Sequence, residues 1–188
     1  MPIDCTKFVI LDRDGVINHD SVDYIKTAEE WIPVDGSLQA IAELSGADFT
    51  VVVATNQSGI GRGLLDEQDL VRIHQKMLSL VQEHGGFIKR IFHCPHLPGD
   101  GCECRKPRVG LLKQIEAEFG CHVRNAPLVG DSLKDMQAAK AMGCLPILVR
   151  TGKGNDTLRE SSSTDMQGVT VVNTLAEAAA MIIERDRA

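Results

Sequence analysis

Two carboxylates that follow an apolar run are the first candidates for chemistry. Asp12 and Asp14 come directly after Phe8–Leu11 and are separated by a single arginine. Carboxylates this close repel each other unless a cation lies between them. Mg²⁺ takes oxygen ligands and is typically held by one or two carboxylates together with waters and substrate phosphate. The pair therefore indicates a magnesium site, with Asp131, after a later apolar run, as a third carboxylate.

The same residues could carry out phosphoryl transfer. That reaction needs a nucleophile, a proton donor for the leaving oxygen, and cations or hydrogen bonds around the phosphoryl oxygens. Asp12 could attack phosphorus, and Asp14 could reach the leaving group because Gly15 allows the chain to turn there. Thr55 offers a hydroxyl and Lys106 a positive charge. The simpler interpretation of the aspartate pair alone is a polar turn leaving a strand.

A second group of residues has the composition of a zinc site. Three cysteines and a histidine lie within eleven residues: Cys94, His96, Cys102 and Cys104. Three thiolates and one imidazole form a closed tetrahedral set, which indicates a structural ion. His93 is the alternative histidine, but Pro95 sets a turn that favours His96. Three surface cysteines without a metal are the simpler alternative, and the scattered Cys5, Cys121 and Cys144 are expected to be packing residues.

The cysteine-rich loop leads directly into Arg105 and Lys106. The loop is short and contains prolines and glycines, so zinc binding would supply the free energy that orders it. We expect the metal to fix these two cations against the aspartates.

Apolar runs that alternate with helical patterns must position these side chains. The predicted strands are Phe8–Leu11, Phe49–Ala54, Ile88–Phe92, Pro127–Gly130, Leu145–Val149 and Val169–Val172. The predicted helices are Asp35–Gly46, Asp66–His84, Val109–Phe119, Ser132–Met142 and one that begins at Thr174. This alternation is typical of an α/β fold of three layers, a Rossmann-like parallel sheet with helices on both faces. Ligands of such folds lie beyond the carboxyl ends of the strands, where the sequence places Asp12, Asp14, Thr55, Asn56, Gln57 and Asp131.

Length and composition bound the remaining possibilities. The 188 residues fit one domain spanning 1–188, and 43% hydrophobic residues are enough for a core. No apolar stretch reaches eighteen residues and no secretion signal is evident, so we expect neither a membrane span nor export. Clustered cysteines without an export signal favour a reducing cytoplasm. A net charge of −6 and 4% aromatic residues argue against a nucleic-acid partner. We expect a monomer.

In these residues the chain resembles the haloacid dehalogenase-like (HAD-like) phosphatases. The match consists of the run Asp12 to Val16 after a strand, Thr55 after the second strand, Lys106 ahead of a helix, and Gly130-Asp131 after a later strand with Asp135 beyond. Its order and spacing cover residues 8 to about 153. Four elements in the right order are together a specific signal, although each alone is weak.

The resemblance implies roles for these residues. Asp12 would be the nucleophile and Asp14 the general acid and then base. Mg²⁺ would be held by Asp12, the Asp14 carbonyl and Asp131. Thr55 and Lys106 would hold the transferring phosphoryl group.

The segments "CPH" and "CECRKP" narrow the resemblance to a zinc-loop subgroup of these phosphatases, which acts on a heptose 1,7-bisphosphate or on histidinol phosphate. The segments "ATNQSGIGRG", "VGDSLKDMQAA" and "LVRTGKG" favour the heptose-bisphosphate members. The subgroup implies that Asp20, Tyr24, Asn56, Gln57, Ser58 and Arg105 contact substrate, and Arg62 is added as an anion-seeking arginine in a glycine-rich loop. The chain departs from the subgroup by one extra residue in the loop 20–24 and by Ser132, where a lysine is expected.

The expected function is magnesium-dependent removal of the C7 phosphate from a heptose bisphosphate through an aspartyl-phosphate, in nucleotide-heptose synthesis for lipopolysaccharide. The forty residues between Asp14 and Thr55, and the fifty between Thr55 and Lys106, are used by predicted elements, so we expect no cap domain. Hydrolysis of histidinol phosphate is one alternative. The other is a zinc-stabilised binding module with a vestigial site, against which the retained acids and Lys106 argue.

Overall fold

A parallel sheet forms the centre of the computed structural model, which describes residue 4 and residues 6–187. Within these residues it has six strands in the order β3-β2-β1-β4-β5-β6. The strands are β1 (Phe8–Leu11), β2 (Thr50–Asn56), β3 (Ile88–Cys94), β4 (Pro127–Gly130), β5 (Leu145–Val149) and β6 (Thr170–Val172). The strand order reverses at β1, which pairs with β2 on one side and β4 on the other. This reversal marks the crevice in which open α/β sheets bind their ligands.

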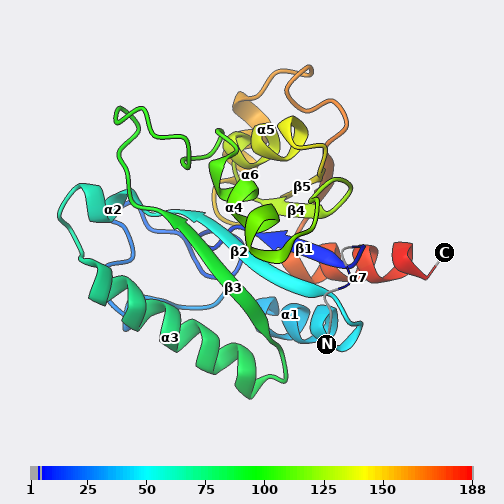
Figure 1. The fold of residues 1–188 in the computed structure, drawn as a ribbon, viewed down its shortest axis with the longest axis horizontal. Helices are drawn as coiled ribbons and strands as arrows, with labels where there is room; N and C mark the ends of the chain where they lie inside the picture. The colour runs from blue at the N-terminus through cyan, green and yellow to red at the C-terminus, as the bar shows by residue number, and fades with distance from the viewer. Residues whose placement is uncertain (1–3, 5, 188) are drawn as a thin grey trace.

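Helices cover both faces of the sheet, as predicted (Figure 1). They are α1 (Ser37–Gly46), α2 (Ser58–Gly61), α3 (Glu67–Glu83), α4 (Gly110–Phe119), α5 (Leu133–Ala141), α6 (Gly154–Glu160) and α7 (Leu175–Asp186). One apolar core joins α1, α3 and α7 to the sheet, and a second joins α4 and α5 to the opposite face.

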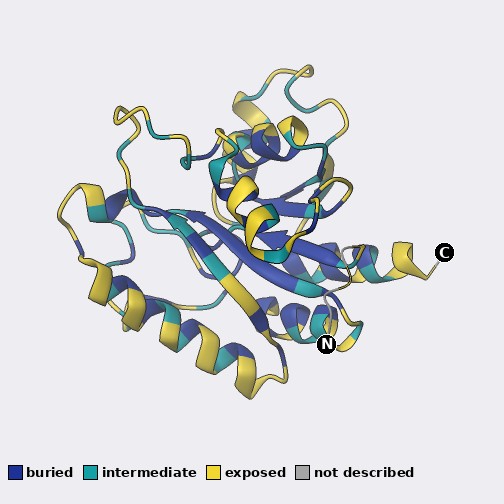
Figure 2. Ribbon diagram, in the orientation of Figure 1, coloured by how far each residue is buried: buried dark blue, intermediate teal, exposed yellow. Residues whose placement is uncertain are grey.

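Side chains of the central strands point alternately to the two faces of the sheet, so one strand contributes residues to both cores. In β1, Val9 and Leu11 belong to the core with α1, whereas Phe8 and Ile10 belong to the core with α4. Successive side chains of a strand point to opposite faces, so a strand buried on both faces must be apolar throughout. Figure 2 shows these central strands buried and the outer faces of the helices exposed.

Helix boundaries follow local capping chemistry. The Asp66 carboxylate accepts a hydrogen bond from the Asp69 backbone N–H at 2.8 Å, and the Asp69 carboxylate accepts one from the Asp66 N–H at 2.9 Å. This reciprocal pair is a capping box, and it starts α3 where the sequence predicts. Gly120 ends α4 in the left-handed conformation (φ 64°).

The structure differs from the sequence prediction in two places that matter for the site. β2 extends to Asn56, so Thr55 and Asn56 are its last residues rather than the loop beyond it. The glycine-rich segment before Arg62, expected to be a loop, contains the short helix α2, and a second short helix that was not predicted, α6, follows β5. Both helices are short and have few apolar residues, which hides them from a pattern of apolar spacing. No helix among the described residues combines the length and apolarity that crossing a bilayer requires.

Candidate active site

The predicted catalytic residues converge at the carboxyl edge of the sheet. Asp12 follows β1, Thr55 lies at the end of β2, and Asp131 follows β4. They line a cavity of about 260 Å³. The predicted residues that also line it are Asp14, Asp20, Tyr24, Asn56, Gln57, Ser58, Arg105 and Lys106.

Lys106 is the buried cation of this cavity, with 2% of its surface exposed. Its Nζ lies 3.0 Å from Asp12 Oδ1 and 2.6 Å from Asp135 Oδ1, and it donates a hydrogen bond to the Ala54 carbonyl at 2.6 Å. Burial alone would lower the pKa of Lys106, but the two carboxylates outweigh it and raise the pKa. The ammonium is therefore permanently charged and fixed beside the predicted nucleophile.

Asp135 was not predicted as a site residue. The sequence places it three residues after Ser132, the spacing of a capping box, and beyond Gly130-Asp131 in the family match, but no role in the site was assigned to it. It does accept hydrogen bonds from the Ser132 backbone N–H at 3.1 Å and from the hydroxyl at 2.6 Å. Its second oxygen faces Lys106, so the same carboxylate caps α5 and anchors the buried cation. A second acid one helical turn after Asp131 was the signal that could have revealed this role.

Asp12, Asp131 and Asp135 offer carboxylate oxygens that all lie within 4.8 Å of one another. Burial, followed by the neighbouring carboxylates, raises the pKa of Asp131 to about 8. Burial also raises the pKa of Asp12 to about 6, although Lys106 opposes the shift. The negative charge of these acids exceeds what one ammonium balances, and an all-oxygen donor set fits a hard divalent cation.

Two glycines pack closely around the Asp131 carboxylate. A Cβ on Gly15 (φ 81°) or on Gly152 (φ 54°) would collide with Asp131 Oδ2. The backbone N–H of Lys153 donates to the same oxygen at 2.8 Å. This packing fixes the orientation of the carboxylate, as a metal ligand requires.

The Asp14 carboxylate does not join the other acids. Arg13 donates to its two oxygens at 2.9 and 3.0 Å, Asn18 Nδ2 donates at 2.9 Å, and Gln57 Nε2 donates at 2.8 Å. Burial would raise the pKa of Asp14, but the Arg13 guanidinium and these hydrogen bonds lower it. The role of the Asp14 carbonyl in holding a metal stays a prediction.

Asn56 has a structural task that the sequence did not reveal. Its Nδ2 donates to the Lys106 carbonyl at 3.1 Å, and its Oδ1 accepts from the Lys106 N–H at 3.0 Å. The amide thus clamps the backbone that carries the buried cation. A substrate contact from Asn56 stays a prediction.

The mouth of the cavity differs partly from the sequence prediction. Asp20 pairs with Lys153 Nζ at 2.8 Å, and Tyr24 lines the cavity. The Arg62 guanidinium lies over the Tyr24 ring, 5.8 Å from its centroid, and Arg62 is not part of the cavity lining in the described chain. The lining includes two lysines that sequence reasoning missed, Lys134 and Lys153. Lys153 lies in the "RTGKG" segment, whose position directly after a strand was the available signal.

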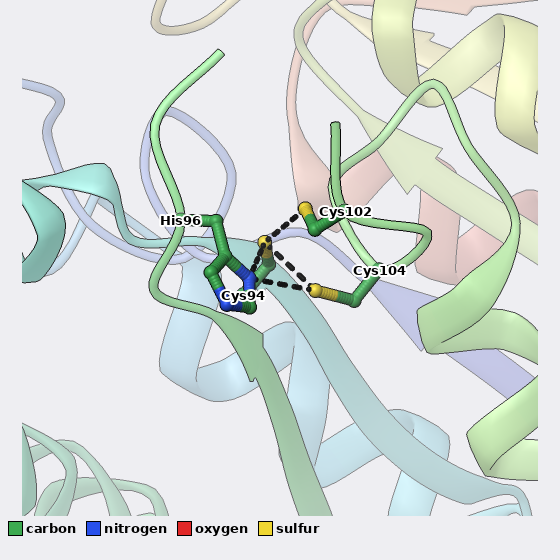
Figure 3. Close-up of side chains that lie close together, drawn as sticks. All are labelled: Cys94, His96, Cys102 and Cys104. Carbon is green, nitrogen blue, oxygen red and sulfur yellow. Dashed lines mark hydrogen bonds between the residues drawn. The ribbon is translucent and has the colours of Figure 1, made fainter. Parts of the chain in front are cut away.

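The predicted zinc ligands meet in one cluster (Figure 3). Cys94 Sγ lies 3.0 Å from Cys104 Sγ and 3.6 Å from Cys102 Sγ, and His96 Nδ1 lies 3.2 Å from Cys104 Sγ. Ligands that surround zinc with bonds of about 2.3 Å stand roughly 3.7 Å apart, so the cluster is slightly tighter than a loaded site. Its donors fit a tetrahedral zinc ion.

His93, the alternative ligand, lies elsewhere. Its Nε2 is 3.3 Å from Glu67 Oε2, at the start of α3. Outside the cluster, Cys144 is buried with a free thiol, as predicted. Cys121 packs in the core beside α4, as predicted, and is also disulfide-bonded. Cys5 lies outside the described residues.

The cysteine-rich loop that carries this cluster is tied to its surroundings by two arginines. Arg105 Nη1 donates to the His96 carbonyl at 3.2 Å, and Arg108 Nη1 donates to the Cys102 carbonyl at 2.5 Å. The loop therefore orients Arg105 at the cavity wall, next to Lys106.

Comparison with known proteins shows the family of this chain. A family model described as HAD-hydrolase-like matches residues 103–178. A D-glycero-beta-D-manno-heptose-1,7-bisphosphate 7-phosphatase of Pseudomonas aeruginosa is 49% identical over 176 residues, which is 94% of this chain and 97% of the relative. The enzyme of the same name from Bordetella bronchiseptica is 48% identical over 178 residues, or 95% and 98% of the two chains. The chain belongs to the HAD-like phosphatases.

The fold agrees with a solved structure of this family. The crystal structure of D,D-heptose 1,7-bisphosphate phosphatase from B. bronchiseptica, complexed with magnesium and phosphate, matches with a TM-score of 0.90 at 47% identity. The match covers 95% of this chain and 99% of that one. This chain is accordingly an enzyme, a phosphatase, with the predicted Rossmann-like architecture.

This phosphatase has no cap domain among its described residues. A loop, α1 and most of β2 occupy the segment between Asp14 and Thr55, and α2, α3, β3 and the cysteine-rich loop occupy the segment between Thr55 and Lys106. The loop that contains Asp20 and Tyr24 contributes to the cavity lining, together with Arg105.

Proposed function

We propose that this phosphatase removes the C7 phosphate of D-glycero-β-D-manno-heptose 1,7-bisphosphate. The observation that supports the substrate is the 48–49% identity, over nearly the full length, to two phosphatases of that name. The β anomer is proposed because both names specify it. Within a cell the product would serve nucleotide-heptose synthesis for lipopolysaccharide; a cytoplasmic location and a monomeric state remain predictions.

The charge of the cavity suits a substrate with two phosphates. Arg105, Lys106, Lys134 and Lys153 all line it. Lys106 forms ion pairs with Asp12 and Asp135, where we place the phosphate that is cleaved. The other three cations line the same cavity. We assign these three to the phosphate that is not cleaved and to the sugar.

The reaction begins with attack of an Asp12 carboxylate oxygen on the C7 phosphorus. The bond between phosphorus and the C7 oxygen breaks, and Asp14 gives a proton to that oxygen as it leaves. The substrate phosphate brings negative charge close to Asp14, which favours the protonated carboxyl that this step needs. Thr55 and Lys106 hold the phosphoryl oxygens through hydrogen bonds and charge.

The second half of the reaction restores the enzyme. Asp14, now ionised, takes a proton from a water molecule, and the water oxygen attacks the phosphorus of the aspartyl-phosphate on Asp12. Inorganic phosphate leaves and the Asp12 carboxylate is regenerated.

Two metal ions complete the proposal. Asp12, Asp131 and the Asp14 carbonyl would hold Mg²⁺, which when bound neutralises charge on the phosphoryl oxygens. The four residues of the cysteine–histidine cluster would hold a structural zinc, whose binding free energy would stabilise the folded loop.

A substrate panel tests the assignment. With Mg²⁺ present, kcat/KM for the β anomer should exceed that for the α anomer and for histidinol phosphate by about 100-fold, or about 2.7 kcal/mol in the transition state. A higher kcat/KM for histidinol phosphate would overturn the proposed substrate while leaving the chemistry intact.

Asp12→Asn tests the chemistry independently of the substrate. The amide has nearly the same shape but is a poor nucleophile, so turnover of every phosphomonoester should be lost while the circular dichroism spectrum is unchanged. Retained full activity would overturn the nucleophile assignment.

A further inference from the structure

Arg13 is a charged side chain with none of its surface exposed, and the reaction steps above do not use it. A buried guanidinium is stable only if its donors are matched by acceptors. Nε and Nη2 pair side-on with the two oxygens of Asp14, at 2.9 and 3.0 Å. The bidentate pair fixes the plane of one group relative to the other.

The rest of the guanidinium is held by two neutral side chains. Nη2 also donates to Gln57 Oε1 at 3.1 Å, and Nη1 lies 3.3 Å from His74 Nε2. Since a guanidinium can only donate, His74 Nε2 must accept, and the ring proton lies on Nδ1. Burial, followed by the charge of Arg13, lowers the pKa of His74 to about 3, so the ring is neutral and able to accept at physiological pH.

Gln57 extends this arrangement to a second predicted catalytic group. Its Nε2 donates to Asp14 Oδ2 at 2.8 Å and to Thr55 Oγ1 at 2.9 Å. The amide orientation is fixed because its oxygen faces the guanidinium and its nitrogen faces two acceptors. A change in the tilt of the Arg13 guanidinium would therefore move the Asp14 carboxylate directly and the Thr55 hydroxyl through Gln57.

His74 stands outside the site that it touches. It projects from the middle of α3 and does not line the substrate cavity within the described residues. Its ring also packs edge-on against His93, with centroids 6.3 Å apart. A residue in this position can alter the geometry of Asp14 without altering the contacts of bound substrate.

We propose that His74 is a positioning residue, which holds the Arg13 guanidinium in the plane where it pairs with Asp14 and thereby sets the direction of the general acid. The proposal rests on the proposed function, because it assumes that Asp14 transfers the proton. Small errors in such placement are costly: a shift of about 1 Å can slow a reaction about 100-fold.

Exchange of the hydrogen-bond acceptor at position 74 tests the proposal. His74→Phe keeps a ring against His93 but cannot accept a hydrogen bond, and His74→Gln offers an amide oxygen to Arg13. We expect the Phe variant to lower kcat about ten-fold, equivalent to about 1.4 kcal/mol, with KM unchanged within about two-fold. The Gln variant should recover most of the lost kcat. His74→Leu is a second apolar variant should the Phe side chain prevent folding.

Ile73→Val is the matched control. Ile73 is fully buried on the same turn of α3, so its shortening weakens packing without touching Arg13. It should lower the melting temperature and leave kcat unchanged. If His74→Phe likewise lowers only the melting temperature, or if the Phe and Gln variants lose kcat equally, His74 has only a packing role and the proposal fails.

The experiment separates this proposal from the proposed function. Turnover is measured with a simple alkyl phosphate, whose alkoxide leaving group needs the proton from Asp14, and with the heptose bisphosphate, so an incorrect sugar assignment leaves the comparison of variants intact. An active wild type with an unaffected Phe variant overturns only the positioning role. A wild type that hydrolyses neither ester with Mg²⁺ present overturns the proposed function and, with it, the positioning role.

Discussion

Replacing Lys106 with methionine should destabilise the folded chain strongly. The ammonium lies among Asp12 Oδ1, Asp135 Oδ1 and the Ala54 carbonyl, all at 2.6–3.0 Å, with 2% of the residue exposed. Methionine fills a similar volume but leaves the carboxylates without their cation. Removal of one partner from a buried ion pair costs about 3–5 kcal/mol.

For a chain of this size each 1 kcal/mol corresponds to about 2–4 °C in melting temperature, so the expected loss is about 6–20 °C. The assay is thermal unfolding in magnesium-free buffer, followed by circular dichroism. Lys113→Met, at an exposed position of α4, is the matched control and should shift the melting temperature by no more than about 2 °C.

The pH dependence of the loss gives an internal check. The pKa of Asp12 is already raised to about 6 in the folded state. Without Lys106 it must rise further above the unfolded value, so the folded variant takes up a proton that the unfolded chain does not hold. Its stability should therefore recover as pH falls from 8 to 5. A variant that melts within about 2 °C of the wild type at pH 8 would refute the reasoning, because the ammonium would then not be a net stabilising charge.

Two further predictions concern metals. Mg²⁺ at a concentration about 100 times its dissociation constant at pH 9 should stabilise the chain by about 2.7 kcal/mol at that pH. The same Mg²⁺ concentration should raise the melting temperature less at pH 6, because Asp12 and Asp131 hold protons there and must release them to bind the ion. Equal gains at both pH values would contradict the carboxylate site. Cys104→Ser, or chelation of zinc in the presence of excess Mg²⁺, should lower both the melting temperature and kcat, because the cysteine-rich loop leads into Arg105 and Lys106. Zinc loss is measured by atomic absorption. If zinc is lost while the melting temperature and kcat stay unchanged, the structural role of the ion is contradicted.

Local sequence determined the elements that build the site. β1, β4 and β5 begin and end where continuous apolar runs do, and α3 begins at its capping box. Period and capping act between neighbours in the chain, so one sequence carries them. The cysteine–histidine cluster was also predictable, because all four residues lie within eleven positions and Cys and His have few other reasons to cluster.

Tertiary structure decided what those residues touch. Asp135 pairs with Lys106 and Asn56 holds the Lys106 backbone, although 29 and 50 positions separate these partners. Arg13 meets His74 across 61 positions, and nothing in either neighbourhood predicts the contact. The strand order brings such groups together at the carboxyl edge of the sheet. Because they are buried there, each charged group needs a partner of opposite charge or a hydrogen bond. The sequence alone could therefore name the acids, the lysine and the cysteine–histidine cluster. Which acid pairs with which cation depends on distances that exist only once the sheet has formed.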